Sequence, residues 1–144
     1  MNNECNTFTN DYSSEWLRLL VGTRGVTRLM APHNQLLSQP DSIDLALCWQ
    51  VLASAEVVAA CYSQNHDRIP DVAKQWLNRR QGLYARRCKI TKEQADKAHS
   101  AVTMALQWQG LKEWCCCHAC GQAWQQRQQE LLQRLAQPTS MLSH

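Results

Sequence analysis

The hydrophobic positions of this chain follow a helical rather than a strand-like period over most of its length. In "SSEWLRLLVG", Trp16, Leu19 and Leu20 fall on one face, the serines can cap the start, and Gly22 ends the pattern. No segment alternates like a strand beyond a few residues at 114–117. The pattern therefore predicts an all-α fold of about five helices.

The most apolar stretch runs from Ile43 to Cys61 and is hydrophobic on nearly every face. A helix of this kind is a central, buried element, and Asp41 or Ser42 is placed to cap its start. Asp44, Gln50 and Glu56 interrupt the stretch. It therefore indicates the core helix of a soluble protein rather than a membrane span.

Prolines set the next boundaries. Pro32 and Pro40 enclose a segment that we interpret as a linker. Pro70 suits the first turn of a helix, where its missing N–H would be unpaired in any case. We expect that helix to run to about Arg86, with Gly82 as a weak point.

The C-terminal half predicts two further helices. Thr91 and Gln94 have the spacing of a capping box and open a helix that we expect to stop at Gly110. The last helix should cover residues 122–137 and stop before Pro138. Four tryptophans fall at helical core positions: Trp16, Trp49, Trp76 and Trp108.

Composition indicates one folded domain over residues 1–144, with residues 1–10 disordered. The chain is 44% hydrophobic, which is too apolar for an intrinsically disordered protein. Its polar start lacks the basic and apolar regions of a signal peptide. Eight cysteines in a chain without such a signal are more often reduced or metal-bound than disulfide-paired. We therefore expect a cytoplasmic protein.

Five metal-ligating side chains crowd into six positions of "LKEWCCCHACGQAW", residues 111–124. Within it, Cys117 and Cys120 form a Cys-x-x-Cys pair followed by Gly121, which is the pattern of a zinc knuckle. Two thiolates then converge on one ion, and glycine permits the sharp turn behind them. Residues 111–121 are accordingly predicted to be a zinc-knuckle-like, cysteine-rich insertion before the last helix.

Zinc normally takes four ligands, and a second Cys-x-x-Cys pair is absent from the sequence. Buried thiols that act as small hydrophobic residues are the main alternative, and a redox dithiol is a third. Under the zinc hypothesis, the missing ligands come from neighbours in the cluster or from distant residues: Cys115, Cys116, His118, Cys88, His99, or the Cys61 and His66 pair.

Positive charge is concentrated in residues 74–97. Eight Lys and Arg against two acidic residues give this segment a charge of +6, whereas the whole chain is +3. Paired arginines suit contacts with phosphates, although a solvated helix face is the simpler interpretation of a charge run. We expect two helices joined by a basic connection to contact DNA, with Arg24 and Arg28 extending the surface. The candidate residues are Arg79, Arg80, Arg86, Arg87, Lys89 and Lys92.

No set of residues forms a catalytic site. Carboxylates are scattered, and neither a phosphate-binding glycine loop nor a nucleophile elbow is present. Adjacent side chains such as Cys117 and His118 rarely face each other, which disfavours a Cys–His nucleophile. The sequence therefore predicts a protein that is not an enzyme and takes no small-molecule substrate.

The zinc-type knuckle between Trp114 and Trp124, in a small, helical and locally basic chain, resembles the late-gene activators and antiterminators of bacteriophages and related mobile elements. The resemblance implies promoter DNA and host RNA polymerase as partners, with Cys117 and Cys120 as presumed metal ligands. A protein-binding adaptor with buried thiols and no DNA contact is the alternative function.

Overall fold

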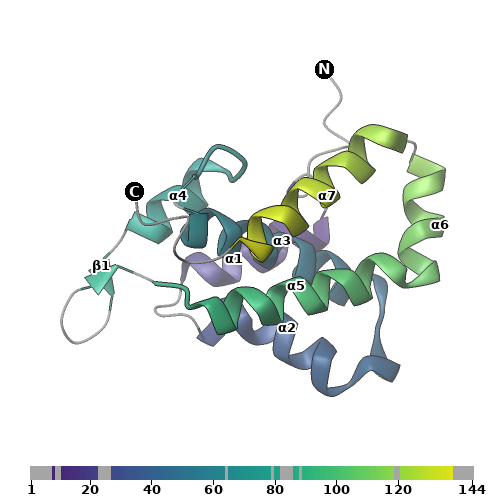
Figure 1. Ribbon diagram of the computed structural model, residues 1–144, viewed down its shortest axis with the longest axis horizontal. Helices are drawn as coiled ribbons and strands as arrows, with labels where there is room; N and C mark the ends of the chain where they lie inside the picture. The colour runs from purple at the N-terminus through teal and green to yellow at the C-terminus, as the bar shows by residue number, and fades with distance from the viewer. Residues whose placement is uncertain are drawn as a thin grey trace.

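The computed structural model confirms the all-α prediction. It describes residues 8, 11–22, 27–63, 65–78, 80–81, 86–87, 89–118 and 121–137, with the backbone alone at 80–81, 86–87, 114–118 and 121. Residues 1–10, which were predicted to be disordered, lie outside the described residues except for residue 8. The elements in chain order (Figure 1) are α1 (Asp11–Val21), α2 (Thr27–Ser38), η2 (Pro40–Ser42), α3 (Leu45–Ser63), α4 (Asp71–Asn78), β1 (Arg80–Gln81), β2 (Arg86–Arg87), α5 (Lys92–Gln107), α6 (Gln109–His118) and α7 (Gly121–Ala136).

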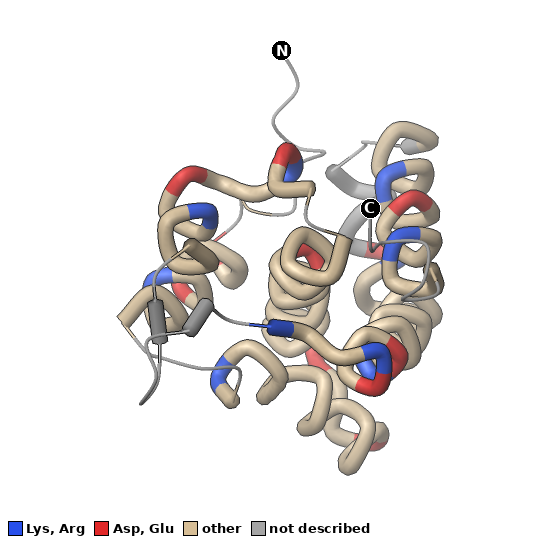
Figure 2. The backbone as a smooth tube through the Cα atoms, turned by 60° about the vertical axis from the view of Figure 1, so that its left-hand side comes forward, with Lys and Arg blue, Asp and Glu red and all other residues tan. Residues whose placement is uncertain are grey.

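Helix α3 is buried along nearly its whole length. It packs against α1, α2, α5 and α7, and Figure 2, which looks almost along α3, shows the other helices arranged around it. It is long and apolar enough to cross a membrane, but 78% of that stretch is buried inside the protein. Coverage on all sides is expected for the core helix of a soluble protein.

Small side chains allow α5 to lie close to α3. The buried face of α5 consists almost entirely of alanines spaced three or four residues apart, which places them in one line along the helix. Packed helix axes usually lie about 8–10 Å apart, and alanine side chains favour the short end of that range. The alanines of this stripe are Ala95, Ala98, Ala101 and Ala105.

Two helix starts test the capping predictions. At α5 the capping box is confirmed: Thr91 Oγ1 accepts from the Gln94 amide at 3.2 Å, and Gln94 Oε1 accepts from the Thr91 amide at 2.9 Å. At α3 the prediction was wrong, because Asp44 Oδ1 accepts from the Leu47 amide at 2.8 Å. Asp41 instead lies in η2.

The predicted linker between Pro32 and Pro40 is largely helical. Helix α2 runs through Pro32 and buries Leu29, Met30 and Leu36 together with this proline. A proline inside a helix removes one backbone hydrogen bond and crowds the preceding turn. The burial of one apolar face against α3 and α5 outweighs that cost.

The predicted stop of α5 at Gly110 was wrong. Helix α5 stops at Gln107, Trp108 adopts an extended backbone, and α6 begins one residue later. A Cβ at Gly110 would lie 2.8 Å from Cζ2 of the Trp108 indole. Glycine therefore allows this indole to fold back over the next helix. Together with α2, this break raises the count within the described residues from about five helices to seven.

The tryptophans confirm most of the predicted core. Trp16, Trp49 and Trp76 are buried, whereas Trp108 is half-buried and packs against the core from its edge. The ring of Trp124 in α7 meets that of Trp49 in an edge-on arrangement, with centroids 6.5 Å apart. This geometry is favourable for aromatic pairs.

A buried polar pair joins α2 to α3. Ser54 Oγ donates to the Leu29 carbonyl at 2.6 Å, so it accepts from His33 Nε2 at 2.5 Å. His33 Nδ1 then carries no proton, and it has no hydrogen-bond partner in the described part of the chain. Burial lowers the pKa of His33 to about 3, so the imidazole is neutral in the folded protein at physiological pH.

Shortening a side chain of α3 should destabilise the fold strongly. Leu52 has no exposed surface, so Leu52→Ala should lower the free energy of unfolding by about 2–5 kcal/mol through reduced burial and a new cavity. Urea denaturation measures the change. Leu19→Ala is the matched control: Leu19 is 44% exposed, and its removal should change stability by less than about 1 kcal/mol. Equal losses in the two variants would contradict the buried position of α3.

Acidification should destabilise the protein through His33. The pKa is about 6.5 in the unfolded chain and about 3 in the folded protein, so only the unfolded state gains this proton as the pH falls below 6.5. The His33 contribution to stability should therefore be lost at about 1.4 kcal/mol per pH unit between these values. Urea denaturation at pH 7 and pH 5 should show a loss about 2 kcal/mol larger in the parent than in His33→Gln. Parallel losses would show that His33 titrates normally when folded.

Candidate nucleic-acid interface

The predicted basic helix ends early, and a hairpin follows it. Helix α4 stops at Asn78 rather than near Arg86, and β1 and β2 then pair in antiparallel fashion. The buried face of α4 consists of Ala73, Trp76 and Leu77. One turn later the same face would carry Arg80 and Gln81, so continuing the helix would bury no further apolar surface.

The register of the hairpin brings arginines together from both strands. Arg80 pairs with Arg87, and Gln81 pairs with Arg86. Directly opposed residues of an antiparallel pair lie on the same face of the ribbon, and like charges in that position destabilise it. The register therefore pairs two arginines, Arg80 and Arg87, across the two strands. Arg79, the remaining predicted arginine, lies outside the described residues.

The chain leaves the hairpin through two lysines. Lys89 is exposed. Lys92, in the first turn of α5, donates to Asp96 Oδ1 at 2.7 Å, and this hydrogen bond raises the pKa of Lys92. Exposed pairs of this kind contribute only about 0–1 kcal/mol, so a phosphate can replace Asp96 at little cost. Of the two residues predicted to extend the surface, Arg28 is exposed in the first turn of α2, and Arg24 lies outside the described part.

The cysteine cluster occupies a different part of the molecule. Residues 114–117 belong to α6 and are helical, so the short strand pattern seen in the sequence was misleading. His118 is the last residue of α6, and Gly121 begins α7. The pair Cys117 and Cys120 therefore spans the joint between these helices, although Cys120 itself and the side chains of residues 114–118 are not described.

The distant ligand candidates do not gather around a metal in the described residues. No group of three His, Cys, Asp or Glu side chains with metal-binding geometry occurs among them, which covers Cys61, His66 and His99. Cys88 is not described, but β2 ends one residue before it. The 16 residues of α5, about 24 Å of helix, separate that strand from α6, and the two lie at opposite ends of Figure 1.

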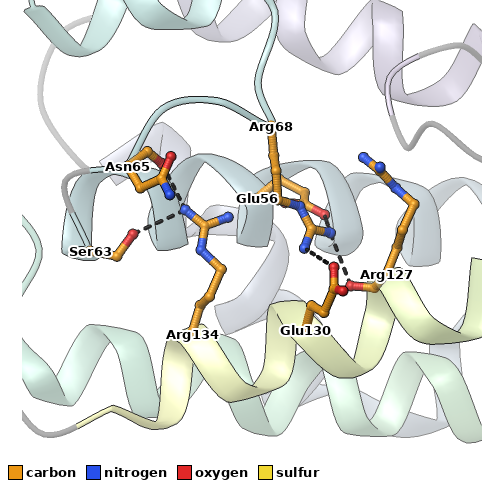
Figure 3. Close-up of polar contacts among 7 residues, drawn as sticks. All are labelled: Glu56, Ser63, Asn65, Arg68, Arg127, Glu130 and Arg134. Carbon is orange, nitrogen blue, oxygen red and sulfur yellow. Dashed lines mark hydrogen bonds and ion pairs between the residues drawn. The ribbon is translucent and has the colours of Figure 1, made fainter.

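Two polar features of the structure were not singled out in the sequence. The Ser54–His33 contact resembles a nucleophile and base, but both side chains are fully buried, so no substrate reaches them. The second feature is an ion-pair cluster around Glu56 and Arg68, which two arginines of α7 flank (Figure 3). The sign of this cluster in the sequence is the carboxylate of Glu56, which lies within the most apolar stretch of the chain.

No protein-family model matches this sequence, and the comparisons with curated proteins and with solved structures give no significant match either. Function is therefore inferred from the geometry and charge of the described residues.

Proposed function

We propose that this protein is a cytoplasmic, non-enzymatic transcription regulator that binds DNA through the hairpin β1–β2 and the start of α5. The observation that supports this most directly is the register that pairs Arg80 with Arg87. Two arginines opposed across a short ribbon repel each other, and an anionic partner would relieve that repulsion. A nucleic-acid backbone supplies such charge at regular spacing.

The shape of a hairpin also suits a duplex. The major groove is about 12 Å wide and admits a two-stranded ribbon as readily as a helix. In this proposal the ribbon takes the place of the two basic helices expected from the sequence. Helix α3 is the proposed central helix of the fold, and α5, which packs on it, follows β2 in the chain.

The start of α5 supports the same interface. The first turn of a helix carries a partial positive charge from its unpaired amides, and phosphates bind favourably there. Exposed Lys89 lies three residues before Lys92, which is the first residue of this turn. Contacts of this type fix the position of a protein on DNA without reading the bases. Sequence specificity would need further contacts.

The joint between α6 and α7 is the proposed place for one structural zinc. Cys117 and Cys120 are its expected first ligands, and Cys115, Cys116 and His118 are the nearby candidates for the rest. A metal at this joint would fix the angle between two helices.

RNA polymerase or another protein is the proposed second partner, as the resemblance to phage activators and antiterminators implies. The adaptor alternative shares the fold and lacks DNA binding.

Removing the opposed arginines should weaken DNA binding in a salt-dependent way. The variant Arg80→Gln/Arg87→Gln should bind duplexes of any sequence more weakly, because phosphate contacts carry no base information. The slope of log affinity against log salt should flatten by about 0.9 for each phosphate that the variant no longer neutralises. Fluorescence anisotropy of a labelled duplex at several salt concentrations measures both quantities.

The matched control removes the same charge elsewhere. Arg18→Gln/Lys112→Gln neutralises two exposed residues on α1 and α6, so both variants fall by two charges from +3. This control should keep nearly all of the affinity and slope of the parent. Absent DNA binding in the parent, or equal effects in the two variants, would favour the adaptor function.

Purified protein should contain about one zinc per chain. Cys120→Ser should release the metal and lower the melting temperature sharply, because binding of a structural zinc contributes directly to folding. Elemental analysis and thermal unfolding measure the two effects. The control variant is Cys61→Ser, which changes a half-buried cysteine of α3. It should retain the zinc. Protein without stoichiometric metal would indicate that the cluster consists of reduced thiols alone.

A further inference from the structure

The two residue pairs of the hairpin β1–β2 differ in their chemistry. Arg80 pairs with Arg87, and Gln81 pairs with Arg86. Successive residues of a strand lie on opposite faces, and directly opposed residues share a face, so each pair occupies its own face of the ribbon. One face thus carries two arginines, whereas the other carries one arginine and one neutral glutamine.

The two pairs also differ in their position along the hairpin. Strand β1 follows α4 and β2 leads toward α5, so Arg80 and Arg87 form the inner pair, next to the helices. Gln81 and Arg86 adjoin the connection between the strands and form the outer pair, about 3.3 Å further along the ribbon. The connecting sequence, residues 82–85, contains no charged residue. Arg86 is therefore the charged residue nearest the turn of the hairpin.

The outer pair has the functional groups that recognise base edges. A glutamine amide makes two hydrogen bonds with N6 and N7 of adenine, and an arginine guanidinium makes two with O6 and N7 of guanine. Opposed residues of an antiparallel pair have Cα atoms about 4.5–5.5 Å apart, which lies between one and two base-pair steps of about 3.4 Å. Two side chains at this separation can contact neighbouring base pairs.

The inner pair suits phosphates instead. Two opposed arginines repel each other unless negative charge compensates them, and base edges carry no net charge. Phosphates supply that charge, and arginine binds them through two parallel hydrogen bonds. A hairpin that enters the major groove with its turn leading and its Gln81–Arg86 face toward the bases leaves Arg80 and Arg87 closer to the phosphates of the groove edge.

We propose that Gln81 and Arg86 are the base-reading residues of the DNA interface, with Gln81 on adenine and Arg86 on guanine. The preferred duplex then carries these two bases on adjacent base pairs or on base pairs two steps apart. This inference rests on the proposed DNA binding, and it separates the residues that specify a sequence from those that only hold the backbone. Gln81 is uncharged, so the charge of residues 74–97 gave no reason to select it.

Selection from a library of randomised duplexes tests the assignment. DNA that binds the purified protein is recovered and sequenced, and fluorescence anisotropy at one fixed salt concentration then compares the selected duplex with its single base-pair variants. The parent should select a duplex that contains both bases. Replacing either the adenine or the guanine should weaken binding by about five- to 150-fold, as expected for the loss of one bidentate contact to a base.

Two variants of Gln81 distinguish base reading from a structural role. Gln81→Ala should lose the preference for adenine and keep the preference for guanine. Gln81→Glu should change the preferred base at the same position from adenine to cytosine, because a carboxylate accepts a hydrogen bond from the cytosine N4 amino group. A hairpin that fails to form cannot produce a new base preference, so Gln81→Glu carries the test if Gln81→Ala loses binding altogether.

Gln125→Ala is the matched control, because Gln125 is exposed on α7, outside the hairpin. It should keep the affinity and the base preference of the parent. Arg80→Gln/Arg87→Gln should bind every duplex more weakly and keep the same preference. A parent that binds DNA without base preference, or Gln81 variants with the preference of the parent, would overturn this inference and leave the proposed DNA binding intact. A parent that binds no duplex would refute the proposed DNA binding, and this inference with it.

Discussion

Helix α3 has no polar face, and this constraint determines how the other helices are arranged. An amphipathic helix needs one covering neighbour, whereas a helix that is apolar all round must be covered on every side. Helices α1, α2, α5 and α7 supply that cover. Close coverage requires small side chains, which explains the alanine face of α5. It also explains why α2 tolerates Pro32 in its interior, since a broken α2 would leave part of α3 exposed.

The polar atoms of α3 impose a second set of requirements. Ser54 and Glu56 are both buried, and a buried polar group is costly unless it is hydrogen-bonded. Ser54 is satisfied by α2 through His33 and the Leu29 carbonyl. One carboxylate oxygen of Glu56 accepts from Arg68, which draws the connection after α3 across the helix and onto α7. These two buried polar side chains thus fix the positions of segments on opposite sides of α3.

Local signals in the sequence were sufficient where the structure depends on local contacts. The end of α1 before Gly22, the capping box at Thr91 and the extent of α7 to within one residue all follow from neighbouring residues. The helical character of α2 and the early end of α4 depend instead on which faces are buried by distant helices. In the candidate interface, the charge of residues 79–92 was visible in the sequence, but the opposition of Arg80 and Arg87 required the hairpin register. The Glu56 cluster was not predictable, because Arg127 and Arg134 lie more than 70 positions further along the chain.

The order of the helices has a consequence for synthesis on the ribosome. Two of the four helices that cover α3, namely α5 and α7, follow it in the chain. At roughly 5–20 residues per second, translation of the 44 residues from 64 to 107 takes about 2–9 s. During that interval the nascent chain presents a 19-residue apolar segment with only half of its cover. Such a segment attracts chaperones and the machinery that recognises membrane helices, so the speed at which α5 emerges helps to decide whether the polypeptide folds in solution.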